Sequence, residues 1–133
     1  MGLIKIPKKS HTFFQEPMIA SEKVLQKSGE IIFKKYCISC HQADGGGVPN
    51  LNPPLIKTTY ILGDKERLIK IILNGLNENI EIDGEYFSNP MPSLNILKDQ
   101  EIADVLTYVR NNFGNKASAV TSAEVKAIRK KAK

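Results

Sequence analysis

The chain concentrates its most reactive side chains in one short window, C-I-S-C-H at residues 37–41. Of 133 residues, only two are cysteines and two are histidines, and the window holds both cysteines and one histidine. Three chemistries use cysteine and histidine this close together: a redox disulfide, a structural zinc site and a covalently attached haem. Each makes different demands on the rest of the chain, so the surrounding sequence discriminates between them.

A redox disulfide and a zinc site fit the surrounding sequence less well than a haem. A redox Cys-x-x-Cys opens a helix that follows a buried strand. The residues before Cys37, S-G-E-I-I-F-K-K-Y, instead have the pattern of a helix that leads into the cysteines. A structural zinc ion takes four ligands, so it would need His11 or a carboxylate such as Asp44 besides the window.

A c-type haem fits the window directly, because two thiols must reach two vinyl groups on one edge of the macrocycle. Cys-x-x-Cys-His is the sequence signal of this attachment. Cys37 and Cys40 would form the thioether bonds, and His41 would supply the proximal ligand of the iron. The motif is short, so zinc, redox thiols and two structural cysteines stay open on the motif alone.

A second axial ligand is available in the segment N-P-M-P-S-L, where Met91 stands between Pro90 and Pro92. The prolines restrict the backbone on both sides of Met91, as suits a thioether held against iron. A methionine ligand opposite histidine raises the reduction potential of a haem. The alternative is that Met91 fills a gap in the core, the usual role of methionine. Given the Cys-x-x-Cys-His window, the ligand interpretation is the stronger one.

The orientation of His41 calls for an acceptor, because a metal-bound histidine usually donates its other ring N–H to a carbonyl or carboxylate. Pro53 and Pro54 follow His41 closely, and either can offer a carbonyl from a rigid segment. The alternative is an ordinary polyproline turn.

The spacing of apolar residues predicts a mostly helical chain. Residues 1–20 lack clear periodicity, so we expect an irregular extension followed by one domain over residues 21–133. A first helix is predicted at 22–37. A second starts at the N-cap residue Asp64 and ends at Gly75.

Between and after these helices the sequence indicates a loop, a hairpin and a third helix. Glycines and prolines at 42–56 predict a loop. I-E-I-D-G-E-Y-F at 80–87 alternates around Asp-Gly, as a tight β-hairpin does. An apolar stripe from Ile102 to Phe113 predicts a helix that Gly114 closes.

A last helix is predicted after Thr121, which has capping-box spacing with Glu124. Val125 and Ile128 of this helix could dock it on the domain.

Gly29 lies inside the first predicted helix, four residues before Phe33 and therefore on the same face. A glycine inside a helix costs about 1 kcal/mol relative to alanine, which indicates close approach of another element. We expect the third helix to cross here, with Phe33 and Tyr108 in contact. The alternative is a break in the helix at Ser28-Gly29.

Taken together, these segments resemble the class I, single-haem cytochromes c. The resemblance rests on G-E-I-I-F-K-K-Y-C-I-S-C-H, P-P-L, N-P-M-P and E-I-A-D-V-L-T-Y-V-R. D-G-G-G-V-P-N-L-N-P-P-L and Y-V-R-N-N-F-G-N followed by V-T-S-A-E-V are similar to small cytochromes and cytochrome domains associated with bacterial quinoprotein dehydrogenases. The stretch from I-L-N-G-L to D-G-E-Y-F adds to this similarity, which spans roughly residues 25–130.

The resemblance implies an all-α cytochrome c fold around one covalent haem, with a short β-hairpin before the loop that carries Met91. It implies that Cys37 and Cys40 bind haem c, that His41 and Met91 ligate its iron, and that the Pro54 carbonyl accepts from His41. One departure is Lys98, where such chains often carry a serine or threonine helix cap.

With both axial positions filled, the expected function is single-electron transfer between redox partners rather than catalysis. The resemblance implies a dehydrogenase as donor and an oxidase or another cytochrome as acceptor. Two alternatives stay open. The chain could be the haem subunit or domain of a dehydrogenase complex, or a haem ligand-binding or sensor protein if Met91 is not a stable ligand.

The net charge of +5 and pI near 9.2 would steer the protein toward acidic faces on its partners. The alternative is an ordinary solvated surface. Its basic clusters, K-I-P-K-K and R-K-K-A-K, are terminal and lack interleaved aromatics, which speaks against nucleic acid. No apolar run has the length of a membrane span. M-G-L-I-K-I-P-K-K lacks the apolar core of a signal peptide. Because c-type haem is attached outside the cytoplasm, we expect a periplasmic or otherwise exported protein whose leader lies outside the printed sequence.

Overall fold

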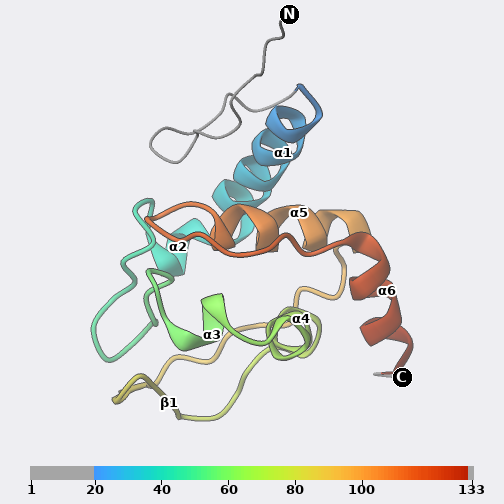
Figure 1. Ribbon diagram of the computed structural model, residues 1–133. Helices are drawn as coiled ribbons and strands as arrows, with labels where there is room; N and C mark the ends of the chain where they lie inside the picture. Colours follow the sequence, from blue (N-terminus) through green and yellow to red (C-terminus); the bar gives the residue numbers. More distant parts are fainter. Residues whose placement is uncertain (1–19, 132–133) are drawn as a thin grey trace, which may run out of the picture.

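The computed structural model describes residues 20–131, which form a group of helices with a small antiparallel hairpin at one edge (Figure 1). The predicted all-α architecture with one short hairpin is confirmed, whereas the expectation for residues 1–20 concerns residues that lie, except for Ala20, outside the described part. The elements in chain order are α1 Ala20–Tyr36, α2 Ile38–His41, α3 Thr59–Leu62, α4 Lys65–Asn74, β1 Ile80–Ile82, β2 Glu85–Phe87, α5 Asp99–Arg110 and α6 Ser122–Lys131.

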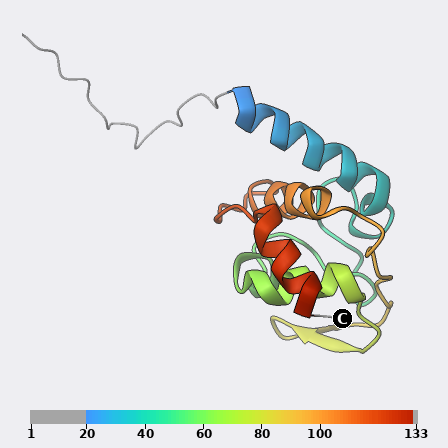
Figure 2. The ribbon, with the colours of Figure 1, turned by 90° about the vertical axis from the view of Figure 1, so that its right-hand side faces the viewer.

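Helices α1 and α5 pack against each other (Figure 2), and they approach each other closely at Gly29. A Cβ atom added to Gly29 would lie only 2.6 Å from the Cβ atom of Tyr108, so no larger residue fits here without displacing α5. The rings of Phe33 and Tyr108 pack beside the crossing with centroids 5.7 Å apart. The predicted crossing is confirmed, and α1 runs through Ser28-Gly29 without a break.

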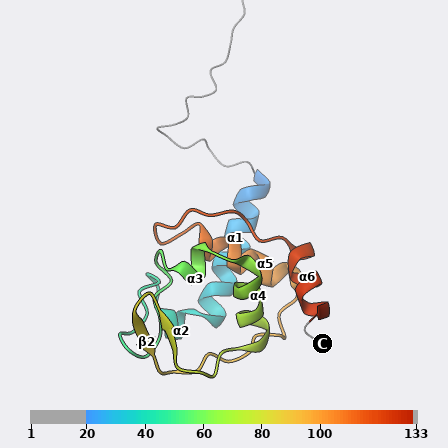
Figure 3. The same cartoon turned by 60° about the horizontal axis from the view of Figure 1, so that its bottom comes forward.

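The core lies between α1, α4, α5 and α6 (Figure 3). Each helix turns one apolar face inward, the arrangement that buries most apolar surface in a small domain. Helix α6 docks through Val125 and Ile128, as predicted. The most deeply buried large side chains are Phe33, Ile69, Ile102, Val105 and Val125.

Local signals in the sequence set the bounds of α4 and of the hairpin. The Asp64 carboxylate accepts from the Glu66 N–H at 3.0 Å and caps α4, and Gly75 ends this helix in the left-handed region with φ of 74°. In the hairpin, Ile80 pairs with Phe87, and the turn has positive φ at Asp83 and Gly84. Positive φ at both central residues is the geometry that Asp-Gly favours in two-residue hairpins. Both predictions are confirmed.

Helix α5 ends earlier than the sequence predicts. It stops at Arg110, so Phe113 lies beyond the helix and Gly114 does not close it. If α5 continued, the N–H groups of residues 111 and 112 would bond the carbonyls of residues 107 and 108. The side-chain amide of Asn111 bonds the Thr107 carbonyl at 3.0 Å, and that of Asn112 bonds the Tyr108 carbonyl at 2.8 Å. These amides thus compete for the helix acceptors, and the chain turns away.

The short helices α2 and α3 were not predicted as separate elements. Helix α2 is a single turn that follows Cys37 directly, and α3 is capped by the Thr58 hydroxyl, which accepts from the Ile61 N–H at 3.2 Å. The predicted loop at 42–56 contains no helix or strand.

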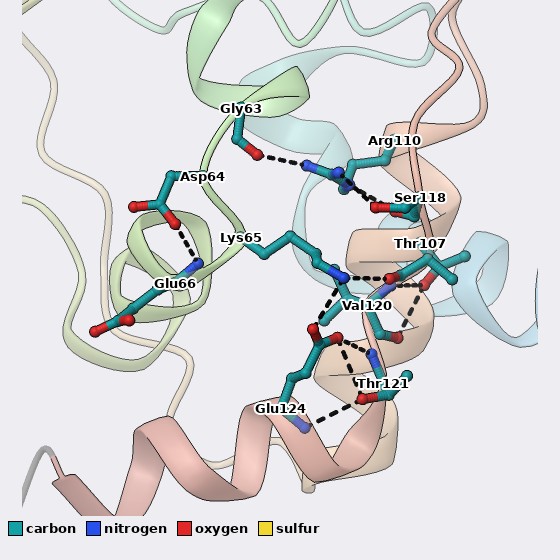
Figure 4. A network of polar contacts seen from close by, with 11 residues as sticks. Gly63, Asp64, Lys65, Glu66, Thr107, Arg110, Ser118, Val120, Thr121 and Glu124 are labelled. Carbon is teal, nitrogen blue, oxygen red and sulfur yellow. Dashed lines mark hydrogen bonds and ion pairs between the residues drawn. The ribbon is translucent and has the colours of Figure 1, made fainter.

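Helix α6 begins with the capping box that the sequence predicts (Figure 4). The Thr121 hydroxyl accepts from the Glu124 N–H at 3.1 Å, and the Glu124 carboxylate accepts from the Thr121 N–H at 2.8 Å. Lys65 of α4 lies 2.9 Å from the same carboxylate, so the start of α6 is tied to α4. At the start of α5, Lys98 provides no hydroxyl cap, but its N–H donates to Glu101 at 2.8 Å.

Candidate haem site

A cavity of about 210 Å³ lies between α2, α3, α4, α5 and the hairpin. Its walls are mainly aliphatic and aromatic, as a large apolar ligand would require. The side chains singled out from the sequence all line it, namely Cys37, Cys40, His41, Pro54 and Met91. Among the described residues that line it, Glu78 is the only carboxylate, and none is a lysine or arginine.

The two cysteines are presented by the junction of α1 and α2. The N–H of Cys37 still bonds the Phe33 carbonyl of α1 at 2.9 Å, while the Cys37 carbonyl accepts from the His41 N–H at 2.9 Å. One helical turn therefore carries Cys37, Cys40 and His41 to the same wall. Cys37 is half-buried and Cys40 exposed, and no disulfide joins them. Burial, with a smaller effect of Cys40, raises the pKa of Cys37 to about 11.

His41 is buried, and its ring orientation is fixed. Its Nδ1 lies 2.9 Å from the carbonyl of Pro53. Because a carbonyl can only accept, Nδ1 must carry the proton, which leaves the Nε2 lone pair free for a metal. Burial lowers the pKa of His41, and the bond to Pro53 opposes this only in part. His41 is thus held as the neutral imidazole that metal binding requires.

The prediction that Pro54 supplies this carbonyl is wrong, since the acceptor is Pro53. The glycine-rich loop decides between the two prolines. The Gly47 N–H donates to the His41 carbonyl at 3.0 Å, and a Cβ on Gly47 would lie 2.7 Å from the Pro53 oxygen. The Leu55 N–H bonds the Gly45 carbonyl at 2.7 Å, which fixes the register one residue before the predicted one. Pro54 still lines the cavity.

Met91 is held against the end of α4 by a pair of backbone hydrogen bonds. The N–H and carbonyl of Met91 bond those of Leu76, both at 2.8 Å. Two further bonds follow, from the Ser93 hydroxyl to the Leu73 carbonyl at 2.6 Å and from the Leu94 N–H to the Ile72 carbonyl at 2.8 Å. A Cβ on Gly75 would lie 2.6 Å from the Met91 oxygen. Gly75 therefore both ends α4 and admits the segment that carries Met91.

Two buried polar residues support the site but were not predicted. Asn115 donates to the carbonyls of Leu55 and Val109, both at 2.8 Å, and accepts from the Lys57 N–H at 2.7 Å. It thereby braces the loop that carries Pro53. The segment Y-V-R-N-N-F-G-N contains this residue, but no periodicity shows which of its asparagines turns inward.

Arg110 is the second, and it is buried at the end of α5. Its guanidinium donates to the Ile61 carbonyl at 2.8 Å and to the Gly63 carbonyl at 3.2 Å, and so caps α3 (Figure 4). Burial lowers its pKa, while the Glu124 carboxylate acts in the opposite direction. A basic residue in the last turn of a predicted helix suggests that it caps that helix. Nothing in the sequence indicated that Arg110 would cap a different helix, α3.

The donors around the cavity fit a covalent haem. The wall provides two thiols one helical turn apart, an imidazole with free Nε2, and a thioether, in a mainly apolar setting. A zinc site needs more nitrogen, sulfur or oxygen ligands. Within residues 20–131, no group of three or more His, Cys, Asp and Glu gathers as a metal site would require. His11, the other candidate ligand for zinc, lies outside the described residues.

Comparison with known proteins agrees with this chemistry. The family model described as cytochrome c matches residues 26–113. The chain belongs to the cytochrome c family. Like other members it binds covalent haem c with its iron, and its function is electron transfer. In the described part of this cytochrome, no helix is both long and apolar enough to cross a membrane.

Similar proteins include free cytochromes and subunits of larger complexes. Cytochrome c-552 of Thermus thermophilus is 36% identical over 115 residues, which cover 80% of this cytochrome and 87% of that protein. The cytochrome c subunit of alcohol dehydrogenase (quinone) from Gluconacetobacter polyoxogenes is 32% identical, over 84% of this chain but 24% of the subunit. The fructose dehydrogenase cytochrome subunit of Gluconobacter japonicus is 34% identical, over 76% of this chain and 22% of the subunit. The expected similarity to dehydrogenase-associated cytochromes is confirmed.

Proposed function

We propose that this protein is a periplasmic single-haem electron carrier, in which Cys37 and Cys40 bind the haem covalently and His41 and Met91 ligate its iron. The observation that carries the proposal is the orientation of the His41 ring and the nitrogen that carries its proton. Its Nδ1 is committed to Pro53, so only Nε2 is free, and His41 shares one cavity with both cysteines and Met91. The bacterial relatives support export.

The residues of the chain account for carrier function rather than catalysis. When bound, haem c supplies one-electron exchange between Fe(III) and Fe(II). His41 and Met91 would both ligate the iron, which would leave no coordination site for a substrate. The walls that α4 and α5 contribute are apolar, which would limit the access of water to a bound haem. The Leu76–Met91 pair and the Pro53 carbonyl hold both ligands, so neither has to move during electron transfer.

Visible spectroscopy tests this ligand set. Protein from a host that matures c-type cytochromes is examined oxidised and reduced, with and without carbon monoxide. We expect a covalent haem spectrum, a far-red methionine–iron band in the oxidised protein, and no carbon monoxide binding in the reduced protein. Met91→Ala should lose the band and bind carbon monoxide, whereas Met18→Ala should behave as the parent. Retention of the band in Met91→Ala would refute the assignment of Met91.

Similarity to dehydrogenase cytochrome subunits favours a second candidate, in which the chain serves as the haem subunit of one enzyme complex. In both cases a dehydrogenase would be the donor, and an oxidase or another cytochrome the acceptor. Size-exclusion chromatography of native extract, followed by haem staining, separates the two. Migration with a dehydrogenase supports a subunit, and migration at monomer size supports a diffusing carrier.

A further inference from the structure

Helix α6 reaches the chain segment that follows Met91. This segment, residues 92–98, connects Met91 to the start of α5. Its first part is fixed to α4 through Ser93 and Leu94. Its second part makes two backbone hydrogen bonds within the described chain, from the Leu97 N–H to the Leu94 carbonyl within the segment and from the Ile102 N–H of α5 to the Lys98 carbonyl. Among residues 20–131, the carbonyls of Asn95 and Leu97 have no backbone donor, so side chains must bind them.

Arg129 of α6 supplies those contacts. Its guanidinium donates to the Leu97 carbonyl at 2.7 Å, to the Asn95 carbonyl at 3.1 Å and to the Asp99 carboxylate at 2.8 Å. The planar group thus joins the end of the segment and the first residue of α5. The Arg129 and Asp99 side chains are each 30% exposed, so solvent only partly screens their attraction.

Helix α6 is itself held firmly enough to act as an anchor. Val125 and Ile128 are buried against the core. At the other end of the helix, Thr107 and the Val120 backbone bond each other, at 2.9 and 3.1 Å, and Lys65 pairs with Glu124 (Figure 4). Helix α6 lies outside residues 26–113, the part matched by the cytochrome c family model, so this anchor is additional to the family's matched core.

We propose that α6 clamps the segment after Met91 and that Arg129 is a positioning residue for this ligand. The inference rests on the proposed ligation by Met91. Leu94 lines the same cavity as Met91, and three residues later the buried Leu97 carries the carbonyl that Arg129 binds most closely. Release of Arg129 leaves the Asn95 and Leu97 carbonyls without the donor that binds them. The segment is then held by the bonds at Met91 and Leu94, the buried Leu97 side chain and the bonds of Lys98 to α5.

The test compares Arg129→Gln with Arg129→Lys, Lys65→Gln and Lys130→Gln in the complete, haem-loaded chain. Lys65→Gln removes the ion pair at the far end of α6 and controls for general loss of stability. Lys130 is an exposed neighbour on the same helix. Imidazole titration of the oxidised protein measures how readily Met91 is displaced, and the far-red band reports its bond. Hydrogen exchange at the Met91 and Leu94 amides reports the clamp without reference to the iron.

We expect Arg129→Gln to raise imidazole affinity and to speed exchange of both amides about tenfold, because hydrogen bonds to a charged group are lost. Arg129→Lys should recover part of both effects. Lys65→Gln, which weakens only the far attachment of α6, should change both less than Arg129→Gln does, and Lys130→Gln should match the parent. The same imidazole affinity and exchange in Arg129→Gln as in the parent, or equal changes in Lys65→Gln, would overturn the proposal. Asp99→Asn provides a second variant if Arg129→Gln does not fold, with a smaller increase expected.

Failure of the underlying ligation gives a different result. A parent protein without the far-red band would refute ligation by Met91. Faster amide exchange in Arg129→Gln would then still support the clamp, and unchanged exchange would overturn it.

Discussion

The close crossing of α1 and α5 depends on the absence of a side chain at Gly29. A Cβ atom there would meet the Asp104 carbonyl and lie 2.6 Å from the Tyr108 Cβ atom. Gly29→Val should therefore lower the free energy of unfolding by about 1–3 kcal/mol through overpacking. Guanidinium denaturation of the haem-loaded protein measures this. Lys27→Val, at an exposed position of the same helix, should cost less than 1 kcal/mol, within the range of helix propensities.

Asn115 illustrates a buried polar residue whose loss leaves several partners unpaired. Asn115→Ala removes hydrogen bonds to Leu55, Lys57 and Val109. We expect the free energy of unfolding to fall by about 1–3 kcal/mol, the cost of unsatisfied buried polar groups. Thermal unfolding checks this, with Asn77→Ala at an exposed position as control. Equal stability of the two variants would show that Asn115 does not brace the loop.

The candidate site was predictable where its chemistry depends on local spacing. Cys37, Cys40 and His41 follow from one motif, and Met91 from its flanking prolines. The Pro53 carbonyl was not predictable, because its register depends on Gly45 and Gly47 folding back on the chain. Asn115 was missed for the same reason, since its partners lie far away in the sequence.

At the scale of elements, attachment of α6 should depend on pH. The hydrogen bond from Lys65, followed by that from the Thr121 backbone, lowers the pKa of Glu124. A carboxylate whose pKa is lower in the folded state stabilises the fold above its unfolded pKa, and this contribution is lost as pH falls through the folded value. Glu124→Gln should therefore lower the melting temperature at pH 7. The difference from the parent should vanish below the lowered pKa.

The measurement is thermal unfolding of both proteins between pH 7 and pH 3. Glu30 and Glu66 also have lowered pKa values through lysine partners, so parent and variant should both lose stability in acid. A constant difference between the two proteins across this range would contradict the role of the Glu124 charge.

Elements with their own end signals were predicted well. Helix α4 has Asp64 and Gly75 at its ends, α6 has its capping box, and the hairpin has Asp-Gly in its turn. The end of α5 was wrong because a stripe of apolar residues continues to Phe113 after the helix has stopped. Phe113 has positive φ and packs on Phe33 with centroids 5.3 Å apart, so it serves the same core from a turn. Apolar spacing shows which residues are buried, but not which backbone conformation buries them.

At the scale of the whole molecule, charge is distributed unevenly. Residues 71–97, which carry Met91 and the hairpin, include four carboxylates and no lysine or arginine. In Figure 1, the hairpin lies at the end of the molecule opposite α1. The basic residues of the described chain gather on other elements, with Lys23, Lys27, Lys34 and Lys35 on α1 and Lys126, Arg129, Lys130 and Lys131 on α6.

This distribution predicts that a redox partner at the Met91 side meets negative potential despite the net charge of +5. Oxidation of the reduced protein by tris(phenanthroline)cobalt(III), a cation, should slow as salt is added, because screening over about 10 Å weakens local attraction. Stopped-flow spectroscopy measures this rate. Replacement of Glu78, Glu81 and Glu85 by glutamine should reduce or reverse the salt effect. A rate in the parent that rises with salt would show that net charge dominates.

The hydrogen-bonded pair of Leu76 and Met91 also separates the turn of the hairpin from Met91, the proposed iron ligand. Residues 77–90 form a loop that starts and ends at this pair. The entropic cost of closing such a loop grows only slowly with its length. The exposed turn at Gly84, where an added Cβ would meet nothing within 4 Å, is therefore suited to an inserted tag or a fluorescent label. Because the Leu76–Met91 pair closes this loop, the turn at Gly84 is a place where the chain can be lengthened by engineering while Met91 keeps its position.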